Sequence, residues 1–408
     1  MGRPTWAALA LVLLLAPTQA RGDDAARIEA LEREVAELRL LVKDLQAERP
    51  PTPPPARAPM DHDHGPAAGG PTSGGWAPTL AIRGFGNVQY DYETNPEGPR
   101  SGSTNHFTNG SMDLLITSEV AQKVGFLAET QFEFNPGGET TVDVERLLVR
   151  YDYSDALNVA MGRGHTALGY WNARYHHGVW LYTTTDRPLL FRFEDDGGIL
   201  PVHFVGLELG GSVETAPGLF SYVFNAANGR GQITDEVQLV EDKNDSKMLA
   251  GMLRFAPEIV PGLAFGVNAL TDAIPSIPGD PTRAHSIGET IAGFHVVYTE
   301  APWEVLLESQ YIRHEDHTFH RTNASWGGYF QAGYRIGKFM PYYRFDWLGI
   351  DERDAFFAGI PGVEDSTQHV FGVRMDPWTF LALKLEYRRL LARSADSNAG
   401  TAQVSFAF

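Results

Sequence analysis

The amino-acid sequence predicts an all-β protein: an antiparallel transmembrane β-barrel of about sixteen strands, preceded by a short α-helical coiled coil. From residue 78 to the C-terminus, segments of roughly ten residues alternate apolar and polar side chains, as strands between lipid and water do. The gaps between these segments alternate between short turns and long loops, which is typical of membrane barrels. The chain also begins with an export signal, which such a barrel requires.

The composition agrees with a barrel and excludes several other classes of protein. Among the 408 residues, no apolar run reaches the ~20 residues of a transmembrane helix, which excludes a helical membrane bundle. The 23 Phe, 15 Tyr and 8 Trp residues suit the aromatic girdles of a membrane barrel. The formal net charge of -18 argues against nucleic acid as a partner, and the absence of cysteine excludes disulfides and thiolate chemistry.

Residues 1–20 have the three parts of a secretory signal peptide. Arg3 supplies the positive charge, residues 6–16 form the apolar stretch, and small residues up to Ala20 offer a cleavage site. The alternative is a membrane anchor, but the apolar stretch is too short to cross a hydrocarbon layer of ~30 Å as a helix. The sequence therefore predicts export across a bacterial inner membrane.

Residues 21–48 carry a heptad repeat, which predicts a coiled coil in the periplasm. A lone helix of this length is only marginally stable in water, so its apolar stripe predicts a partner helix and hence oligomerisation. The alternative is a surface helix that packs on its own domain. β-branched residues at position a with Leu at d favour two strands, which leaves dimer and trimer both open. The predicted oligomerisation contacts are Ile28, Leu31, Val35, Leu38, Val42 and Leu45.

Residues 49–77, first rich in Pro and then rich in Gly, predict a linker that is stiff at its start and flexible at its end. Within it, His62 and His64 alternate with Asp61 and Asp63. Two histidines between carboxylates can bind a transition metal weakly, but they supply too few ligands for a tight site. We interpret this stretch as a solvated linker.

Residues 78–408 make up the predicted barrel. The segment 379–391 shows the pattern best, because Leu383 and Leu385 share one face whereas Lys384 and Glu386 share the other. Charges that recur on one face require water there, and an aliphatic face requires lipid or a core. An even number of strands places both ends of the barrel on the short-turn side, where the coiled coil also lies. The side chains predicted to face the lumen are Arg83, Glu129, Glu133, Arg344, Asp346, Lys384, Glu386 and Arg388.

The last segment, 401–408, alternates in the same way and stops at Phe408. Here the sequence resembles bacterial outer-membrane proteins in general, whose final strand commonly ends in Phe. The resemblance implies that Phe408 is a membrane-insertion signal read by the barrel-insertion machinery, and that the barrel lies in outer-membrane lipid. The alternative is a terminal Phe by chance, which is about one in twenty from typical residue usage.

Residues 164–201 form the longest gap and follow the fifth segment. In this topology the chain resembles the general trimeric porins, which fold their third long loop into the lumen. The resemblance implies a pore constriction in which arginines face acids across a narrow channel. The alternatives are an ordered extracellular loop and a loop at a subunit interface. The predicted constriction residues are Tyr170, Trp171, Arg174, Arg187, Arg192, Glu194, Asp195 and Asp196.

Four histidines, His165, His176, His177 and His203, raise the question of a metal site near this loop. On an extended backbone, the adjacent side chains of His176 and His177 point apart, and no carboxylate at suitable spacing accompanies them. Histidines in a polar lumen need no metal to explain them. The sequence therefore predicts no metal site and no cofactor.

The layout over nearly the full chain resembles bacterial porins that carry an N-terminal periplasmic coiled coil, including the phosphate-selective porin family. The resemblance implies a homotrimer whose water-filled channel passes small hydrophilic solutes or ions. Phosphate selectivity does not fit a chain with 33 basic and 51 acidic residues. Without a Gly-x-Ser-x-Gly elbow or a Ser/His/Asp set, the sequence predicts no enzyme. The alternative function is a structural or adhesive barrel whose stalk contacts the cell wall or a partner.

Overall fold

The structure is a computed structural model that describes residues 79–94, 102–134, 138–176, 178–192, 198–233 and 241–408. The predicted signal peptide, coiled coil and linker lie outside these residues, and so do the oligomerisation contacts expected in the coiled coil. Among the residues described, no helix is long and apolar enough to cross a membrane.

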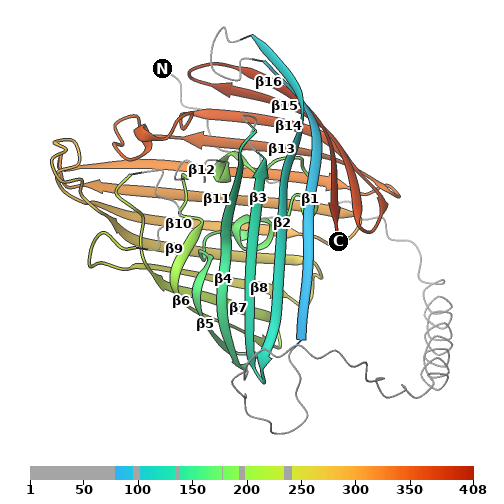
Figure 1. Cartoon of the computed structure of the whole chain (residues 1–408), viewed down its shortest axis with the longest axis horizontal. Helices are drawn as coiled ribbons and strands as arrows, with labels where there is room; N and C mark the ends of the chain where they lie inside the picture. Colours follow the sequence, from blue (N-terminus) through green and yellow to red (C-terminus); the bar gives the residue numbers. More distant parts are fainter. Residues whose placement is uncertain (1–78, 95–101, 135–137, 177, 193–197, 234–240) are drawn as a thin grey trace, which may run out of the picture. The chain divides into compact units, whose positions relative to one another are not determined.

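Sixteen antiparallel strands form one closed barrel (Figure 1). Each strand pairs with its neighbours in sequence and the first pairs with the last, which removes the open edges at which sheets aggregate. The predicted antiparallel barrel of about sixteen strands is confirmed. The strands are β1 (Thr79–Thr94), β2 (Ser103–Ala121), β3 (Val124–Phe134), β4 (Thr140–Ser154), β5 (Leu157–His165), β6 (His203–Thr215), β7 (Gly218–Ala227), β8 (Met248–Pro257), β9 (Leu263–Ile274), β10 (Ile287–Tyr298), β11 (Trp303–Asp316), β12 (Arg321–Tyr334), β13 (Phe339–Gly349), β14 (Ser366–Trp378), β15 (Leu381–Ala392) and β16 (Ser397–Ala407).

The seam between β1 and β16 closes the barrel, and Phe408 completes it. Phe408 and Gly84 exchange two backbone hydrogen bonds, each 2.9 Å long. The Phe408 ring lies directly over Gly84, where a Cβ atom would come within 2.2 Å of the ring. Gly84 therefore leaves room for the terminal aromatic side chain, which is 64% exposed on the outside of the seam.

Side chains alternate between the two faces of the wall along each strand. In β9, Ala264, Asn268 and Leu270 are buried, whereas Phe265 and Val267 between them are exposed. The exposed face is therefore apolar, which is the reverse of a soluble β-protein and fits a wall in contact with lipid.

The connections are tight at one end of the barrel and longer at the other. β2 ends at Ala121 and β3 begins at Val124, and in the same way β6 ends at Thr215 and β7 begins at Gly218. Lys123 adopts a left-handed conformation with φ of 65°, which lets the first of these turns reverse within two residues. The longer connections contain the short helices α2 (Tyr170–Tyr175), η1 (Leu189–Phe191) and η3 (Phe357–Gly359).

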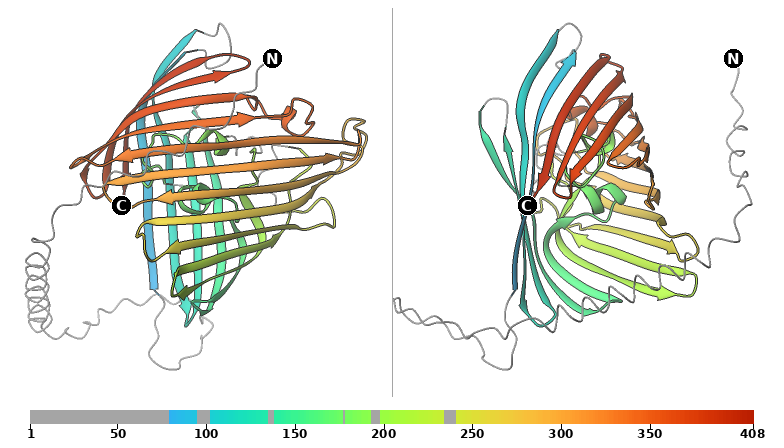
Figure 2. Two further views of the ribbon diagram at one scale, coloured as in Figure 1. Left: turned by 180° about the vertical axis from the view of Figure 1, so that it is seen from behind. Right: turned by 90° about the vertical axis from the view of Figure 1, so that its right-hand side faces the viewer.

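The longest described connection, between β5 and β6, turns into the barrel (Figure 2). We call residues 166–202 the lumen loop. Its backbone contacts strands that are far apart in the wall: Gly169 donates its N–H to Asn268 of β9, and Gln403 of β16 donates to the Thr185 carbonyl. The lumen loop therefore crosses the interior rather than following one side of it.

Among the described residues, an apolar cluster lies inside the barrel. It joins the lumen loop to the inner faces of β8 to β12, which we call the apolar half of the lumen. From the loop come Leu168, Trp171, Leu189, Leu190, Phe191, Ile199 and Leu200, and from the wall come Ala250, Ala264, Leu270, Ile291, Leu306, Ile312 and Tyr329.

Candidate functional site

The lumen loop begins at an acceptor site on β11. The Glu308 Oε2 atom accepts the backbone N–H groups of Tyr170 at 3.2 Å and Trp171 at 3.1 Å, and the Tyr329 hydroxyl donates to the same oxygen at 3.3 Å. A carboxylate at this position satisfies free N–H groups at the start of α2. Gly169, with φ of 71°, is required here, because a Cβ atom would lie 1.7 Å from the other Glu308 oxygen.

Apolar burial then holds the loop in the apolar half. Trp171 is 1% exposed, and its ring lies 4.9 Å from that of Tyr182 and 5.9 Å from that of Tyr329, measured between centroids. Leu190 of η1 is fully buried and packs towards Gly327 of β12, where a side chain would collide with it. Each such large side chain stabilises the packed loop by about 1.5–3 kcal/mol.

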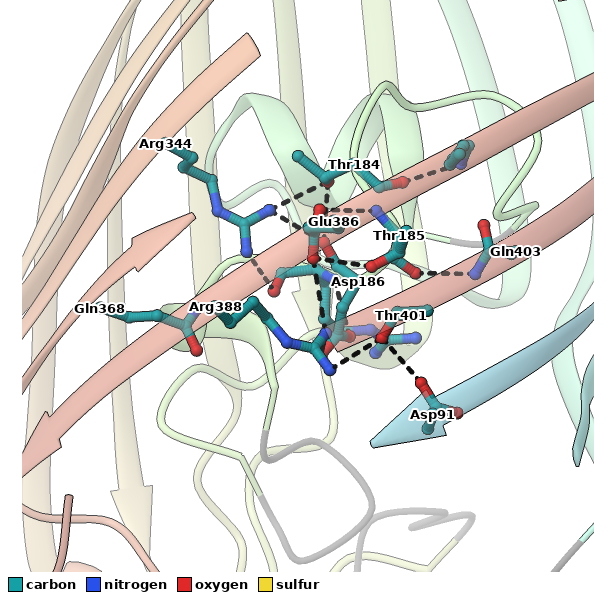
Figure 3. A network of polar contacts seen from close by, with 12 residues as sticks. Asp91, Thr184, Thr185, Asp186, Arg344, Gln368, Glu386, Arg388, Thr401 and Gln403 are labelled. Atoms are coloured by element: carbon teal, nitrogen blue, oxygen red, sulfur yellow. Dashed lines mark hydrogen bonds and ion pairs between the residues drawn. The ribbon is translucent and has the colours of Figure 1, made fainter. Parts of the chain in front are cut away.

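A second set of contacts holds the loop in what we call the polar half of the lumen, the inner faces of β13 to β16 and β1 to β3. Figure 3 shows these contacts with residues of β13, β15 and β16. Arg344 of β13 donates to the Thr184 hydroxyl at 2.9 Å, to the Asp186 carbonyl at 2.8 Å and to the Arg187 carbonyl at 3.1 Å. Its remaining Nε atom pairs with Asp346 at 3.1 Å. One guanidinium thus fixes three positions of the loop.

Two charged residues of β15 continue this set. The Lys384 ammonium donates to the carbonyls of Val179 at 2.5 Å and Thr184 at 2.7 Å. Glu386 accepts the backbone N–H of Thr185 at 2.9 Å and its hydroxyl at 2.6 Å. In this half, wall residues therefore bind both an N–H group and carbonyl groups of the loop backbone.

The end of the lumen loop is fixed by Arg230, which follows β7. Its two terminal nitrogens donate to the carbonyls of Gly198 at 3.0 Å and Ile199 at 2.6 Å, while Nε pairs with Glu289 at 3.0 Å. His314 contacts the same Glu289 carboxylate at 3.1 Å. Charged residues outside the loop therefore hold it at its exit as well as at its middle.

These contacts change how the predicted lumen-facing charges are understood. Arg344 and Asp346 are 0% exposed, and Lys384 and Glu386 are each 3% exposed. All four are buried inside the barrel. Arg344, Lys384 and Glu386 bind the lumen loop, and Asp346 pairs with Arg344, so none of them faces open water. The sequence showed on which face they lie, and it carried no signal for what would cover them.

Asp186, in the lumen loop, carries the charge that faces the arginines. Its carboxylate lies 3.0 Å from Arg192 and 3.1 Å from Arg388. Burial disfavours the charged carboxylate, but the two guanidiniums outweigh burial and lower the pKa of Asp186 below its usual range. Asp186 was not among the residues predicted from sequence. The acids predicted to face the arginines, Glu194, Asp195 and Asp196, lie outside the described residues.

A cavity of about 400 Å³ remains between the lumen loop and the polar half. Of the residues predicted from sequence, Glu133, Arg187 and Arg388 line it. The polar side chains that also line it are Asn87, Gln89, Asp91, Glu93, His106, Ser111, Gln131, Thr185 and Asp186. Both the loop and the wall therefore contribute polar side chains to the lining of this cavity.

The other predicted residues lie elsewhere. Arg174 is exposed on the last turn of α2, and Tyr170 packs edge-on against Tyr175 with ring centroids 5.7 Å apart. Arg83 is exposed on β1. Glu129 is buried and pairs with Arg146 at 2.5 Å, so it does not line the cavity.

Three of the four histidines that the sequence analysis weighed lie together at the root of the lumen loop: His165, His176 and His203. His177 lies outside the described residues. The carboxylate that the sequence analysis did not find near them comes from β4, where Glu145 lies 2.8 Å from His203.

No protein-family model and no curated protein sequence matches the chain. Among solved structures, the fold is similar to an anion-selective porin from Comamonas acidovorans, with a TM-score of 0.59 and 10% identity over 81% of this chain and 100% of that one. It is also similar to the outer membrane channel DcaP of Acinetobacter baumannii, with a TM-score of 0.54 and 11% identity over 81% of this chain and 97% of that one. The fold is also similar to the trimer form of OmpT, an outer membrane protein of Vibrio cholerae. The TM-score is 0.51, with 8% identity over 81% of this chain and 100% of that one. At these identities the likeness shows the porin-type barrel fold.

Proposed function

We propose that this protein is an outer-membrane porin, a water-filled channel for small hydrophilic solutes or ions. The observation that carries the proposal is the polar cavity of about 400 Å³ between the lumen loop and the polar half. A structural core would bury apolar groups there, whereas Asp91, Glu133, Arg187 and Arg388 require water or a polar solute. The similar folds named as a porin and as an outer membrane channel support the same function.

The charges around the cavity support a weak preference for cations. Four carboxylates line it, from Asp91, Glu93, Glu133 and Asp186, against the guanidiniums of Arg187 and Arg388. Charged rings at a constriction select ions by sign, and here both signs are present with an excess of acid. The passage that we propose therefore admits both cations and anions, with a modest preference for cations.

Location and assembly are part of the same proposal. We infer export by the signal peptide of residues 1–20, insertion read from Phe408, and a homotrimer whose periplasmic stalk is residues 21–48. The apolar outer face of the wall supports contact with lipid. A trimer form of a protein with a similar barrel supports the oligomer number.

The purified full chain in a planar lipid bilayer tests the channel. We expect stepwise conductance, and a reversal potential in a salt gradient that indicates a modest preference for cations. Arg388→Gln should shift the reversal potential further towards the cation, because it removes one of the two cavity arginines. Arg353→Gln, an exposed arginine outside the cavity, is the matched control and should leave the potential unchanged.

The competing function is a structural or adhesive barrel with a blocked lumen. The packing of the lumen loop in the apolar half favours it, since the loop fills that half with buried side chains. A folded barrel that gives no conductance steps would contradict the porin and support this alternative. Deletion of residues 21–77 would then abolish its role and leave the barrel intact.

A further inference from the structure

Three histidines meet where the lumen loop leaves the barrel wall. His165 is the last residue of β5 and His203 is the first residue of β6, and they are direct partners in the antiparallel register. His176 directly follows α2 as its C-cap, so the loop returns it to the point from which the loop departs. Two wall residues and one loop residue are thereby brought together.

The three imidazole rings lie close together. One ring nitrogen from each residue lies within 4.8 Å of the others. The ring centroids are 4.4 Å apart for His165 and His176, 4.7 Å for His176 and His203, and 5.4 Å for His165 and His203. Zinc–nitrogen bonds of about 2.0–2.1 Å place tetrahedral ligands about 3.4 Å apart, so small side-chain rotations complete the approach.

The surroundings are those of a built site. Nε2 of His165, both ring nitrogens of His176 and Nε2 of His203 are shielded from solvent. Nε2 of His203 lies 2.8 Å from the Glu145 carboxylate, and both side chains are at least nine-tenths buried. Metal-binding histidines commonly donate their second ring N–H to a carboxylate, which fixes the tautomer and turns the other nitrogen towards the metal.

We propose that His165, His176 and His203 bind a divalent transition-metal ion of the zinc type, with Glu145 as the positioning carboxylate of His203. Neutral imidazoles suit such an ion, and a fourth position is left for water. The alternative is a metal-free cluster held by a protonated His203 and Glu145. This alternative accounts for the contact between His203 and Glu145 without an ion, and zinc titration distinguishes the two.

The bound ion would join the wall to the lumen loop. His165 and His203 belong to neighbouring strands, whereas His176 belongs to the loop just past α2. Loss of the ion therefore releases one contact of the loop without touching the wall pairing of β5 and β6. This role is independent of whether the cavity conducts.

Zinc alone, titrated into the full chain in detergent against a chromophoric chelator, tests the proposal. The His62→Ala/His64→Ala variant is the background, because the linker histidines can bind zinc weakly. In that background we expect one zinc ion per chain and a rise in the unfolding temperature on zinc addition. His176→Gln should weaken zinc binding by more than the ~10–100-fold expected for Glu145→Gln, since it removes a ligand rather than an outer partner.

His317→Gln, on an exposed part of the chain away from the cluster, is the matched control and should leave zinc affinity unchanged. X-ray absorption on the zinc-loaded background protein avoids any effect of the cluster substitutions on folding. Three nitrogen ligands at about 2.0–2.1 Å would support the site. The proposal is overturned by fewer than three imidazole ligands, by zinc binding that vanishes with His62 and His64 alone, or by unchanged affinity in His176→Gln.

Discussion

In the apolar half of the lumen, Leu168, Trp171 and Leu190 are buried against the wall, whereas in the polar half Arg344 and Lys384 bind the carbonyls of the same loop. Apolar burial is not directional and tolerates small shifts of the backbone. Hydrogen bonds from fixed charges define positions within a few tenths of an ångström. Charged residues also fix the two ends of the loop in the apolar half, at Glu308 and at Arg230 with Glu289. In the polar half such bonds fix the middle of the loop, which borders the cavity.

The same comparison explains why buried charges are retained inside the barrel. A buried charge is costly unless it is paired and hydrogen-bonded. Arg344 meets this condition with Asp346 on one side and loop oxygens on the other. Hydrophobic residues could stabilise the loop as well, but they would not hold the Thr184 to Arg187 backbone in one place.

Trp171→Ala should have the largest effect on stability. The side chain is 1% exposed in the apolar half, and its removal should lower the free energy of unfolding by roughly 3–5 kcal/mol. Trp180→Ala is the comparison in the polar half, where the ring is half-buried against Phe85, and its effect should be clearly smaller. Urea unfolding in lipid measures both. Equal losses would mean that the halves do not differ in apolar burial.

Arg344→Met should come next, with a loss of about 3 kcal/mol, because it leaves Asp346 buried without its guanidinium. It also frees the loop between Thr184 and Arg187, so single-channel current should become noisier. Arg353→Met is the matched control on the surface and should change neither quantity. Unchanged noise in the single-channel current of Arg344→Met would show that apolar burial alone positions the loop.

Replacing glutamate by glutamine in each half gives a finer test. Glu308→Gln should cost about 1 kcal/mol or less, since an amide oxygen still accepts the Tyr170 and Trp171 N–H groups. Glu386→Gln should cost more, because Arg388 lies 3.6 Å away and loses a counter-charge. Unfolding measurements on the two variants compare them directly. The reverse order would contradict the division into halves.

The smallest expected effect is the pH dependence of stability that comes from Asp186. The pKa of Asp186 is lowered in the folded protein, so its contribution is complete above the unfolded pKa of about 3.9 and is lost as the pH falls towards the folded pKa. The stability difference between the unmodified protein and Asp186→Asn should therefore be constant from pH 5 to 7 and shrink below about 4. A difference that already falls at pH 6 would mean that the arginines do not hold this carboxylate.

The wall of the barrel was predictable because its chemistry repeats along the chain. Leu383, Lys384, Leu385 and Glu386 reveal both faces of β15 by sequence alone, since a strand has a period of two. The alternation of tight and long connections in the sequence also predicted which end of the barrel carries the tight turns, and the structure agrees. The sequence showed the length and the mixed composition of the lumen loop, but it did not show the path of the loop.

The site was less predictable, since its residues are far apart in sequence. Asp186 faces Arg388 across 202 positions of the chain, and no local pattern connects them. The histidines show the same limit: His165 and His176 are close in sequence, yet Glu145 and His203 complete the cluster from β4 and β6. The sequence argument assumed an extended backbone at His176, whereas His176 is the helical C-cap of α2 and so reaches residues of β5 and β6.

The sequence by itself predicted the antiparallel barrel, because repeated alternation of apolar and polar residues, separated by alternating short and long connections, is typical of a membrane barrel wall with two different faces. It also determined which charges point inward, Arg344, Lys384 and Glu386 among them. Only the tertiary structure decided that the lumen loop would cover those charges, pack half of the interior as a core and leave a polar cavity in the other half. The physical reason is that the wall follows from local periodicity, whereas the path of the loop depends on contacts between residues that meet only after the barrel has closed.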